Sequence, residues 1–158
     1  MSQLHSYVFE GNLEGTLKLL QEQPDLLDAP DQRGFPPLVL ACYSDRYGIS
    51  KLLLEKGADV EARDGMGNTA LMGVAFKGLS GMAKLLIEEY GADVNAQNKA
   101  GGTPLTFAAT FGQYEMVDQL LTYGADPSHA DQDGHTALSL AKAKGHQRIV
   151  DLLTERAG

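Results

Sequence analysis

Short runs of apolar residues at helical spacing alternate with polar turns along the whole chain. In residues 2–10, Leu4 and Val8 fall on one face of a predicted helix, and His5 belongs to the polar residues assigned to its exposed face. A second predicted helix begins near Leu13, carries leucines on one face and ends before a proline. The pattern therefore starts with a helical hairpin that is polar on its outer side.

The same arrangement then recurs at a fixed interval. The tripeptide Gly-Ala-Asp begins at residues 57, 91 and 124, and each copy precedes a polar turn, a glycine and a short run rich in alanine and leucine. The glycines that head these runs, Gly34, Gly67, Gly101 and Gly134, lie 33, 34 and 33 residues apart. A period of about 33 residues predicts a stack of repeated supersecondary units that bury their apolar faces against one another.

Each repeat is predicted to contain two antiparallel helices. Thr69, Thr103 and Thr136 precede the first helix of their repeats and are expected to cap it, because a threonine side chain accepts a hydrogen bond from the helix start. Pro36 stands at the same place in the preceding repeat and cannot do so, a loss of about 1 kcal/mol. The second helix of that repeat is expected over residues 49–56.

The run Thr103-Pro104-Leu105-Thr106-Phe107-Ala108-Ala109 resembles the TPLHxAA signature of ankyrin repeats at every position except the histidine. The resemblance implies an all-α repeat solenoid in which each helix–turn–helix unit is joined to the next by a β-turn or hairpin loop. It implies one domain over residues 1–158 with about five repeats. Its predicted parts are an N-terminal cap at 1–30, internal repeats at 31–63, 64–97 and 98–130, and a C-terminal cap at 131–158.

Three departures from the family pattern are informative. Val39, Met72, Thr106 and Ser139 occupy the place of the family histidine, so this residue is interpreted as absent and the turns as less tightly braced. Asp45 replaces the glycine between the two helices of repeat two, which is expected to be softer.

The third departure is Lys142, which stands where the preceding repeats have Cys42, Ala75 and Ala109. A lysine at a stacking position indicates that nothing stacks on it, and favours a C-terminal cap that completes the array at Gly158.

Composition narrows the class of partner. The net charge is −8 and the pI about 4.8, with 13 scattered lysines and arginines. Binding to nucleic acid depends on neutralising phosphates, so such a partner is disfavoured and a protein with basic patches is favoured. The N-terminus lacks the pattern of a signal peptide and no apolar run is long enough to span a membrane. Together with a single cysteine, these features lead us to expect a cytoplasmic protein.

No motif for catalysis, metal binding or a cofactor is recognisable. The histidines at 5, 129, 135 and 146 are scattered and do not form ligand pairs, so each is expected to be solvated or locally hydrogen-bonded. Cys42 has no base nearby in the sequence and is interpreted as a small buried hydrophobe. The segment Asp131-Gln132-Asp133-Gly134 lacks the rest of a calcium-binding loop. The sequence therefore predicts no enzyme activity and no cofactor.

The resemblance also places a binding surface. In ankyrin repeats the loops between repeats project as fingers, and the fingertips and exposed ends of the inner helices line a concave face. Large apolar residues collect at these positions, as is common at interaction sites. The predicted partner-binding residues are Arg33, Phe35, Tyr43, Met66, Asn68, Phe76, Lys77, Lys99, Thr110, Phe111, Asp133, His135 and Lys144.

Three functional hypotheses follow. The first is a non-catalytic protein–protein interaction module, acting as an inhibitor or adaptor and monomeric when free. The second is a small-molecule or metal binder, or an accessory subunit of an enzyme, which requires a pocket with convergent polar groups. The third is a structural protein that self-associates through the ends of the array, which Lys142 disfavours.

Overall fold

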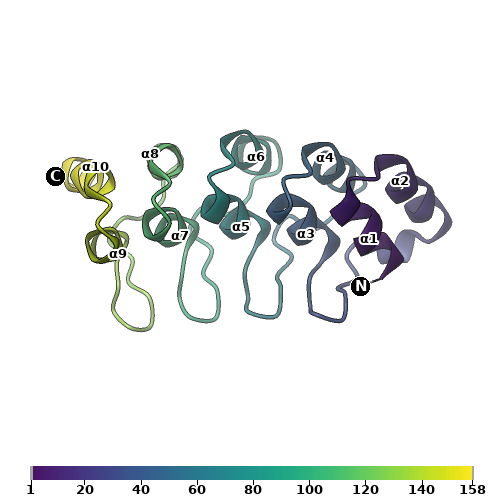
Figure 1. Ribbon diagram of the computed structural model, residues 1–158, viewed down its shortest axis with the longest axis horizontal. Helices are drawn as coiled ribbons and strands as arrows, with labels where there is room; N and C mark the ends of the chain where they lie inside the picture. The colour runs from purple at the N-terminus through teal and green to yellow at the C-terminus, as the bar shows by residue number, and fades with distance from the viewer. Residues whose placement is uncertain (1, 158) are drawn as a thin grey trace.

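The computed structural model describes residues 2–157, which form helix pairs stacked side by side in a single row (Figure 1). Loops project from one side of the helices, and no β-strand occurs within the described residues. The prediction of an all-α repeat solenoid is confirmed.

The inner helices are α1 (Gln3–Glu10), α3 (Pro37–Tyr43), α5 (Ala70–Lys77), α7 (Pro104–Thr110) and α9 (Ala137–Lys144). The outer helices are α2 (Leu13–Glu22), α4 (Tyr47–Glu55), α6 (Ser80–Lys84) followed by η2 (Leu85–Glu89), α8 (Tyr114–Thr122) and α10 (Gln147–Ala157), and a short 3₁₀ turn, η1 (Pro24–Leu26), follows α2.

The inner helices α3, α5 and α7 each pack between the inner helices of the neighbouring repeats, and α1 and α9 pack at the two ends of the row. Small side chains lie at this contact: Ala41, Cys42, Ala75 and Ala109 are fully buried. Their small volume lets successive helices approach closely, and the leucines of the outer helices cover the same layer from behind. The core is therefore a continuous band along the row, as expected for a repeat array.

The predicted caps are present at three inner helices. The hydroxyl groups of Thr69, Thr103 and Thr136 accept hydrogen bonds from the backbone N–H three residues further on. Pro36 precedes α3 without any side-chain cap, as predicted. The second helix of that repeat begins two residues earlier than expected, at Tyr47.

His5 corrects two of the sequence-based predictions. Its periodicity assigns it to an exposed face, but its side chain is only 1% exposed and lies between Ser2 and the next repeat. One ring nitrogen is 2.6 Å from the Ser2 hydroxyl, and Nε2 is 2.7 Å from the carbonyl oxygen of Phe35. Ser2 caps α1 as the threonines cap the later helices, so Ser2-Gln3-Leu4-His5 aligns with the TPLH signature. The family histidine is therefore present, in the first repeat, and it braces the first finger.

The fingers share one hydrogen-bonding pattern at their base. The carboxylate Oδ1 of Asp31 accepts hydrogen bonds from the backbone N–H groups of Arg33 and Phe35, at 2.9 and 3.0 Å. The same pair of bonds recurs in each later finger, to Asp64, Asn98 and Asp131. Each turn also contains a glycine with positive φ, the conformation that glycine adopts without strain.

Asp45 adopts the left-handed conformation expected of the glycine that it replaces, with φ 56°. It is the single non-glycine residue with positive φ among residues 2–157. Aspartate tolerates this conformation better than most residues but less well than glycine. The expectation that repeat two is softer remains a prediction.

The additional residue of repeat three is accommodated in the outer row. The sequence places it near Tyr90, at the end of the outer helix. In the structure the helix widens to a π-helical turn, η2, immediately before Tyr90. A π-turn inserts one residue into a helix without breaking it. The inner helix and finger of the next repeat consequently keep their places in the row.

The predicted ends of the array are only partly described. Met1 and Gly158 lie outside the described residues. Lys142 is exposed on α9, as expected if nothing stacks on that position. The assignment of repeat five as a C-terminal cap remains a prediction.

Replacing His5 by alanine should lower the free energy of unfolding by about 1–3 kcal/mol, the range for removing one partner of a buried hydrogen bond. His135→Ala is the control because His135 is exposed, and a surface change of this kind has an effect within about 0.5 kcal/mol. Urea titration followed by circular dichroism measures both. Equal effects of the two substitutions would contradict the bracing role of His5.

Asp31→Asn should flatten the dependence of stability on pH. Burial raises the pKa of Asp31, but hydrogen bonds from Phe35 and Arg33 outweigh burial, so the pKa in the folded protein lies below 3.8. A carboxylate with a lowered pKa stabilises the fold above its unfolded pKa, and this contribution is lost as the pH falls through the folded pKa. Asn98 shows that an amide oxygen accepts the same two backbone bonds. Thermal melts between neutral and strongly acidic pH should therefore fall less steeply for the variant, whereas parallel curves would contradict this.

Candidate functional site

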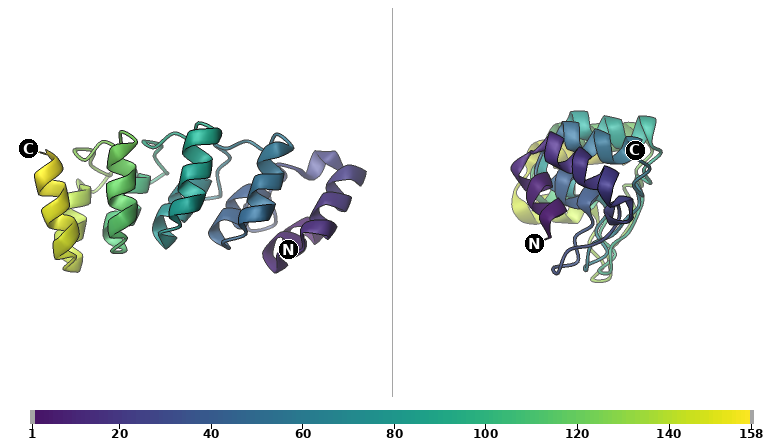
Figure 2. Two further views of the ribbon diagram at one scale, coloured as in Figure 1. Left: turned by 90° about the horizontal axis from the view of Figure 1, so that it is seen from above. Right: turned by 90° about the vertical axis from the view of Figure 1, so that its right-hand side faces the viewer.

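The fingers and the inner helices form the two arms of an L in cross-section, with the outer helices behind (Figure 2). We call the surface inside this L the groove face; it consists of the finger turns 31–36, 64–69, 98–103 and 131–136 and the exposed sides of α3, α5, α7 and α9. The predicted partner-binding residues come from these segments or from the residue that directly follows an inner helix. The Asp and Asn residues at the finger bases fix the backbone of the fingertips.

A row of aromatic rings crosses the middle of the groove face. The Tyr43 ring is stacked on Phe76, with centroids 5.9 Å apart, and Phe111 meets Phe76 edge-to-face at 4.4 Å. Tyr43 is 44% exposed and Phe111 49% exposed, whereas Phe76 between them is half-buried. The rings come from three successive repeats. Their mutual contacts fix their orientation, so they form a rigid apolar surface open to solvent.

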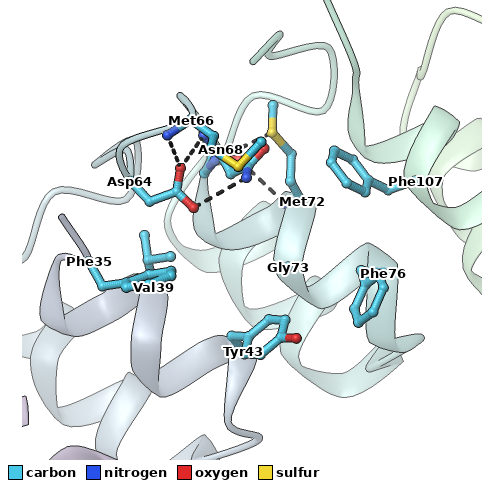
Figure 3. A pocket seen from close by; sticks show the side chains of 11 residues that line it. Phe35, Val39, Tyr43, Asp64, Met66, Asn68, Met72, Gly73, Phe76 and Phe107 are labelled. Atoms are coloured by element: carbon cyan, nitrogen blue, oxygen red, sulfur yellow. Dashed lines mark hydrogen bonds between the residues drawn. The ribbon is translucent and has the colours of Figure 1, made fainter. Parts of the chain in front are cut away.

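An apolar hollow of about 280 Å³ lies beside this row (Figure 3). Phe35, Val39 and Tyr43 form one wall; Met72, Phe76 and Phe107 form the other, and Met66 lies at the finger end. Met66 is 68% exposed. The remaining lining residues are Asp64, Asn68, Thr69 and Gly73. We refer to this space as the apolar hollow.

Gly73 is the reason that the hollow exists. It is the fourth residue of α5, and the corresponding residues of α3, α7 and α9 are Leu40, Phe107 and Leu140. A side chain at this position would project toward Tyr43, since a Cβ placed on Gly73 would lie 3.4 Å from the Tyr43 ring. The missing side chain leaves the space that its neighbours fill in the other repeats.

A second hollow of about 410 Å³ adjoins the first and shares Phe35 and Tyr43 with it. Its lining includes three basic residues, Arg33, Arg46 and Lys77, and no carboxylate. The Lys77 ammonium lies 4.6 Å from the centre of the Tyr43 ring. We call this space the cationic hollow; the remaining residues that line it are Phe9, Leu40 and Ser44.

The charges around the two hollows are unequally satisfied. Arg33 forms an ion pair of 3.1 Å with the buried Asp31, and Arg46 donates two hydrogen bonds to the carbonyl oxygen of Phe9. Lys77 has no ion pair within the described residues. Asp64, at the edge of the apolar hollow, accepts three hydrogen bonds from Met66 and Asn68. The carboxylates near the site are therefore engaged by their own loops, while Lys77 remains free.

Several predicted polar residues serve the framework of the array. The Lys99 ammonium donates to the carbonyl oxygen of Gly65 at 2.8 Å, and its backbone N–H donates to Met66. Asn68 accepts a hydrogen bond from the Asn98 amide, and the Thr110 hydroxyl donates to the backbone within α7. These side chains border the groove face, but their polar atoms link one repeat to the next or close a helical turn.

The predicted residues of repeat five lie apart from the hollows. Asp133, His135 and Lys144 are exposed, and none of them lines either hollow. The structure thus brings together the predicted residues of repeats two and three, with Phe111 of repeat four adjoining them through Phe76. Their role in binding remains a prediction.

Several residues that shape the site were not predicted from the sequence. The pattern marks Val39 and Met72 only as replacements of a framework histidine. Gly73, as a glycine inside a predicted helix, indicates from the sequence only that this helix is weakened by roughly 0.5–1 kcal/mol relative to alanine. Phe107 and Arg46 do not stand out in the pattern at all. The signal for Gly73 is present in the repeat register, because this residue aligns with large apolar residues in the repeats on either side.

Residues 2–157 contain no group of three or more His, Cys, Asp or Glu side chains arranged to hold a metal ion. In the same residues, no helix has the length and apolar character required to cross a membrane.

Comparison with known proteins agrees with the repeat architecture. A family model described as ankyrin repeats (3 copies) matches residues 4–98 and 71–158. The chain is 35% identical to inversin of Gallus gallus over 104 residues, 66% of the chain and 9% of inversin. It is 32% identical to ankyrin repeat domain-containing protein 63 of Mus musculus over 107 residues, 66% of the chain and 27% of that protein.

A further relative is the target of rapamycin complex 2 subunit AVO2 of Saccharomyces cerevisiae, which is 31% identical over 110 residues, 68% of the chain and 26% of that protein. The chain thus matches less than a third of the length of each of these three relatives. The similarity lies in the repeats, and the repeat geometry described above has the same period. The chain belongs to the ankyrin repeat family, whose repeats are general protein–protein interaction modules.

Proposed function

We propose that this protein binds a partner protein through the groove face and does so without catalysing a reaction. The observation that carries the proposal is the row formed by Tyr43, Phe76 and Phe111 beside the apolar hollow. Exposed aromatic residues grouped in this way are the usual anchors of protein interfaces. The rings are already held in place by one another, so binding requires little ordering of the free protein.

The alternative of a small-molecule binder or enzyme accessory subunit is less well supported. The apolar hollow, at about 280 Å³, falls just below the range of about 300–1,000 Å³ typical of ligand pockets. Its polar atoms on Asp64 are engaged by backbone and side-chain donors of the same finger. A side chain of a partner protein fits such a space better than a metabolite that needs several convergent polar contacts.

The mode of action that we propose is occlusion or recruitment. A rigid groove that holds a segment of a partner acts as an inhibitor when the segment is functional, and as an adaptor when the segment is only an attachment point. We further propose that the protein is a monomer when free and acts in the cytoplasm, where its single thiol stays reduced.

The proposal is tested by affinity capture from a lysate of the source cell. Phe111→Glu and Phe76→Glu place a charge in the aromatic row, and each should abolish capture of partners bound there, because a buried unpaired charge is strongly unfavourable. Tyr47→Glu is the matched control, since Tyr47 is 46% exposed but begins the outer helix α4. Circular dichroism confirms that all three variants remain folded. Unchanged capture of every partner by folded Phe76→Glu and Phe111→Glu would reject the groove face as the binding surface.

Cys42 should be unreactive in the folded protein. It is buried, its sulfur lies 3.6 Å from the Ser50 hydroxyl, and burial raises the pKa of the thiol to about 12, so the reactive thiolate is scarce at neutral pH. Alkylation by iodoacetamide in increasing urea should follow the global unfolding curve measured by circular dichroism. Rapid alkylation without denaturant would show an accessible thiol and would reopen the question of cysteine chemistry.

A further inference from the structure

We infer that the groove face takes an acidic peptide segment of the partner that carries an apolar anchor side chain. This inference rests on the proposed function and adds the chemistry of the partner. The anchor occupies the apolar hollow, and a carboxylate next to it in the chain lies against Lys77 in the cationic hollow. The two hollows are neighbours, because Phe35 and Tyr43 line both of them.

The shape and lining of the apolar hollow favour one apolar side chain. Its walls are aromatic, aliphatic and methionine side chains, and Met66 and Met72 are flexible enough to adjust to different anchors. The volume of about 280 Å³ is small for a ligand that is bound as a whole molecule. An apolar side chain buried there would be surrounded by Phe35, Tyr43, Phe76 and Phe107, the arrangement typical of an interface hot spot.

The distribution of charge favours an acidic segment, although the molecule as a whole is acidic. The inner helices α3, α5, α7 and α9 carry Lys77, Lys142 and Lys144 and no carboxylate. The outer helices, including η2, carry nine carboxylates and five basic residues. The outer helices thus carry a net negative charge and these inner helices a net positive one. The finger turns carry Asp31, Asp64, Asp131 and Asp133, of which only Asp64 lines one of the two hollows. The expectation of a partner with basic patches, drawn from net charge, suits the outer face rather than this groove.

Lys77 is the residue that gives the groove face its preference for an acidic segment. Its ammonium lies over the Tyr43 ring and has no carboxylate partner among the described residues. Asp45, which is exposed and follows α3, does not line the hollow. Arg46 adds a second positive charge whose hydrogen bonds go to a neutral carbonyl group. A carboxylate here would form an ion pair in a partly apolar setting, where screening by water is weaker.

The junction beneath the hollow is less cross-linked than its neighbours. Arg46, Gln113 and His146 each hydrogen-bond a carbonyl oxygen at the end of the preceding inner helix. Leu79 has the same position in repeat three, and it has no polar group to offer to the Tyr43 carbonyl.

The fingers of repeats two and three also have fewer hydrogen bonds between them than the later fingers have. Finger 64–69 is bonded to finger 98–103 by three hydrogen bonds and finger 98–103 to finger 131–136 by two. Within the part of the chain that the structure describes, no hydrogen bond joins finger 31–36 to finger 64–69. Packing of α3 against α5 and of Tyr43 against Phe76 therefore holds this junction, without a polar link between its two fingers.

The geometry limits the spacing of the two features in the bound segment. Lys77 lies over the ring that walls both hollows, so the carboxylate and the anchor must be close in the partner sequence. An extended chain of about three residues spans roughly 10 Å. We expect an acidic residue within about three positions of the anchor.

The test is selection of a random-peptide library displayed on phage against the immobilised full chain. The expected result is enrichment of peptides with an aromatic or large aliphatic residue and Asp or Glu within about three positions of it. Enrichment of basic peptides, or no enrichment, would overturn the inference. The enriched consensus peptide is then synthesised and titrated by fluorescence polarisation, at low and high salt.

Gly73→Leu provides the sharpest variant because it fills the apolar hollow and favours the helix. It should weaken binding of the consensus peptide by about thirtyfold or more, as for loss of a hot spot. Gly81→Leu is the matched control: Gly81 is also a helical glycine, in α6, and a Cβ added to it would meet no atom within 4 Å. Equal affinities of the two variants would place the peptide elsewhere and overturn the inference.

Lys77→Glu tests the electrostatic part. It should weaken binding of the acidic peptide by about tenfold at low salt and by less at high salt. Lys51→Glu, on the outer helix α4, is the control and should leave the affinity nearly unchanged. If Lys77→Glu binds as tightly as the wild type, the acidic partner is rejected. Loss of cellular capture in Phe76→Glu together with selection of basic peptides would reject the acidic segment while leaving the proposed function intact.

Discussion

The base of each finger is closed by one side-chain oxygen that accepts two backbone N–H groups, and the groove face depends on this interaction. Asp31, Asp64, Asn98 and Asp131 each bind the N–H groups two and four residues further along the chain. Two of the residues that donate these N–H groups, Phe35 and Met66, line the apolar hollow with their side chains. The framework bond therefore uses only their backbone, which leaves their side chains free to differ from repeat to repeat.

The same separation of backbone and side chain leaves room for a local group of basic side chains, at the cationic hollow, on an acidic chain. The finger carboxylates are engaged at the turn bases, and Arg33 is neutralised by Asp31. Nine of the 21 carboxylates lie on the outer helices. Net charge alone does not describe the surface that a partner meets. What matters at the groove is that Lys77 stands over the Tyr43 ring and forms no ion pair within the described residues.

The sequence predicts the fold well because the constraints that produce it repeat. The capping threonines, the turn glycines and the small residues at the stacking positions recur with the period, and all of them are local. The exposed aromatic residues were also predictable, since the framework does not require them. The position of Tyr43 against Phe76, however, depends on contacts between residues of different repeats. Those contacts follow from the rise and rotation of one repeat relative to the next, which no single repeat specifies.

Two errors have a simpler cause. Helical periodicity alone places His5 on the surface, because a buried polar side chain looks like a surface residue by that criterion. Its partners, Ser2 and the carbonyl group of Phe35, become visible only when the first repeat is aligned with the others. Helix propensity describes what Gly73 does to its own helix. The hollow arises because the missing side chain leaves the space beside Tyr43, between α3 and α5, unfilled.

The π-helical turn of η2 has a consequence for how this array tolerates change in length. The extra residue widens the helix over Leu85–Glu89, and the chain returns to register before Ala92, whose N–H donates to Leu86 at 2.9 Å. The surplus length is absorbed on the side of the molecule that faces away from the fingers. An insertion of one residue in the outer row is therefore compatible with constant spacing of side chains across the opposite face.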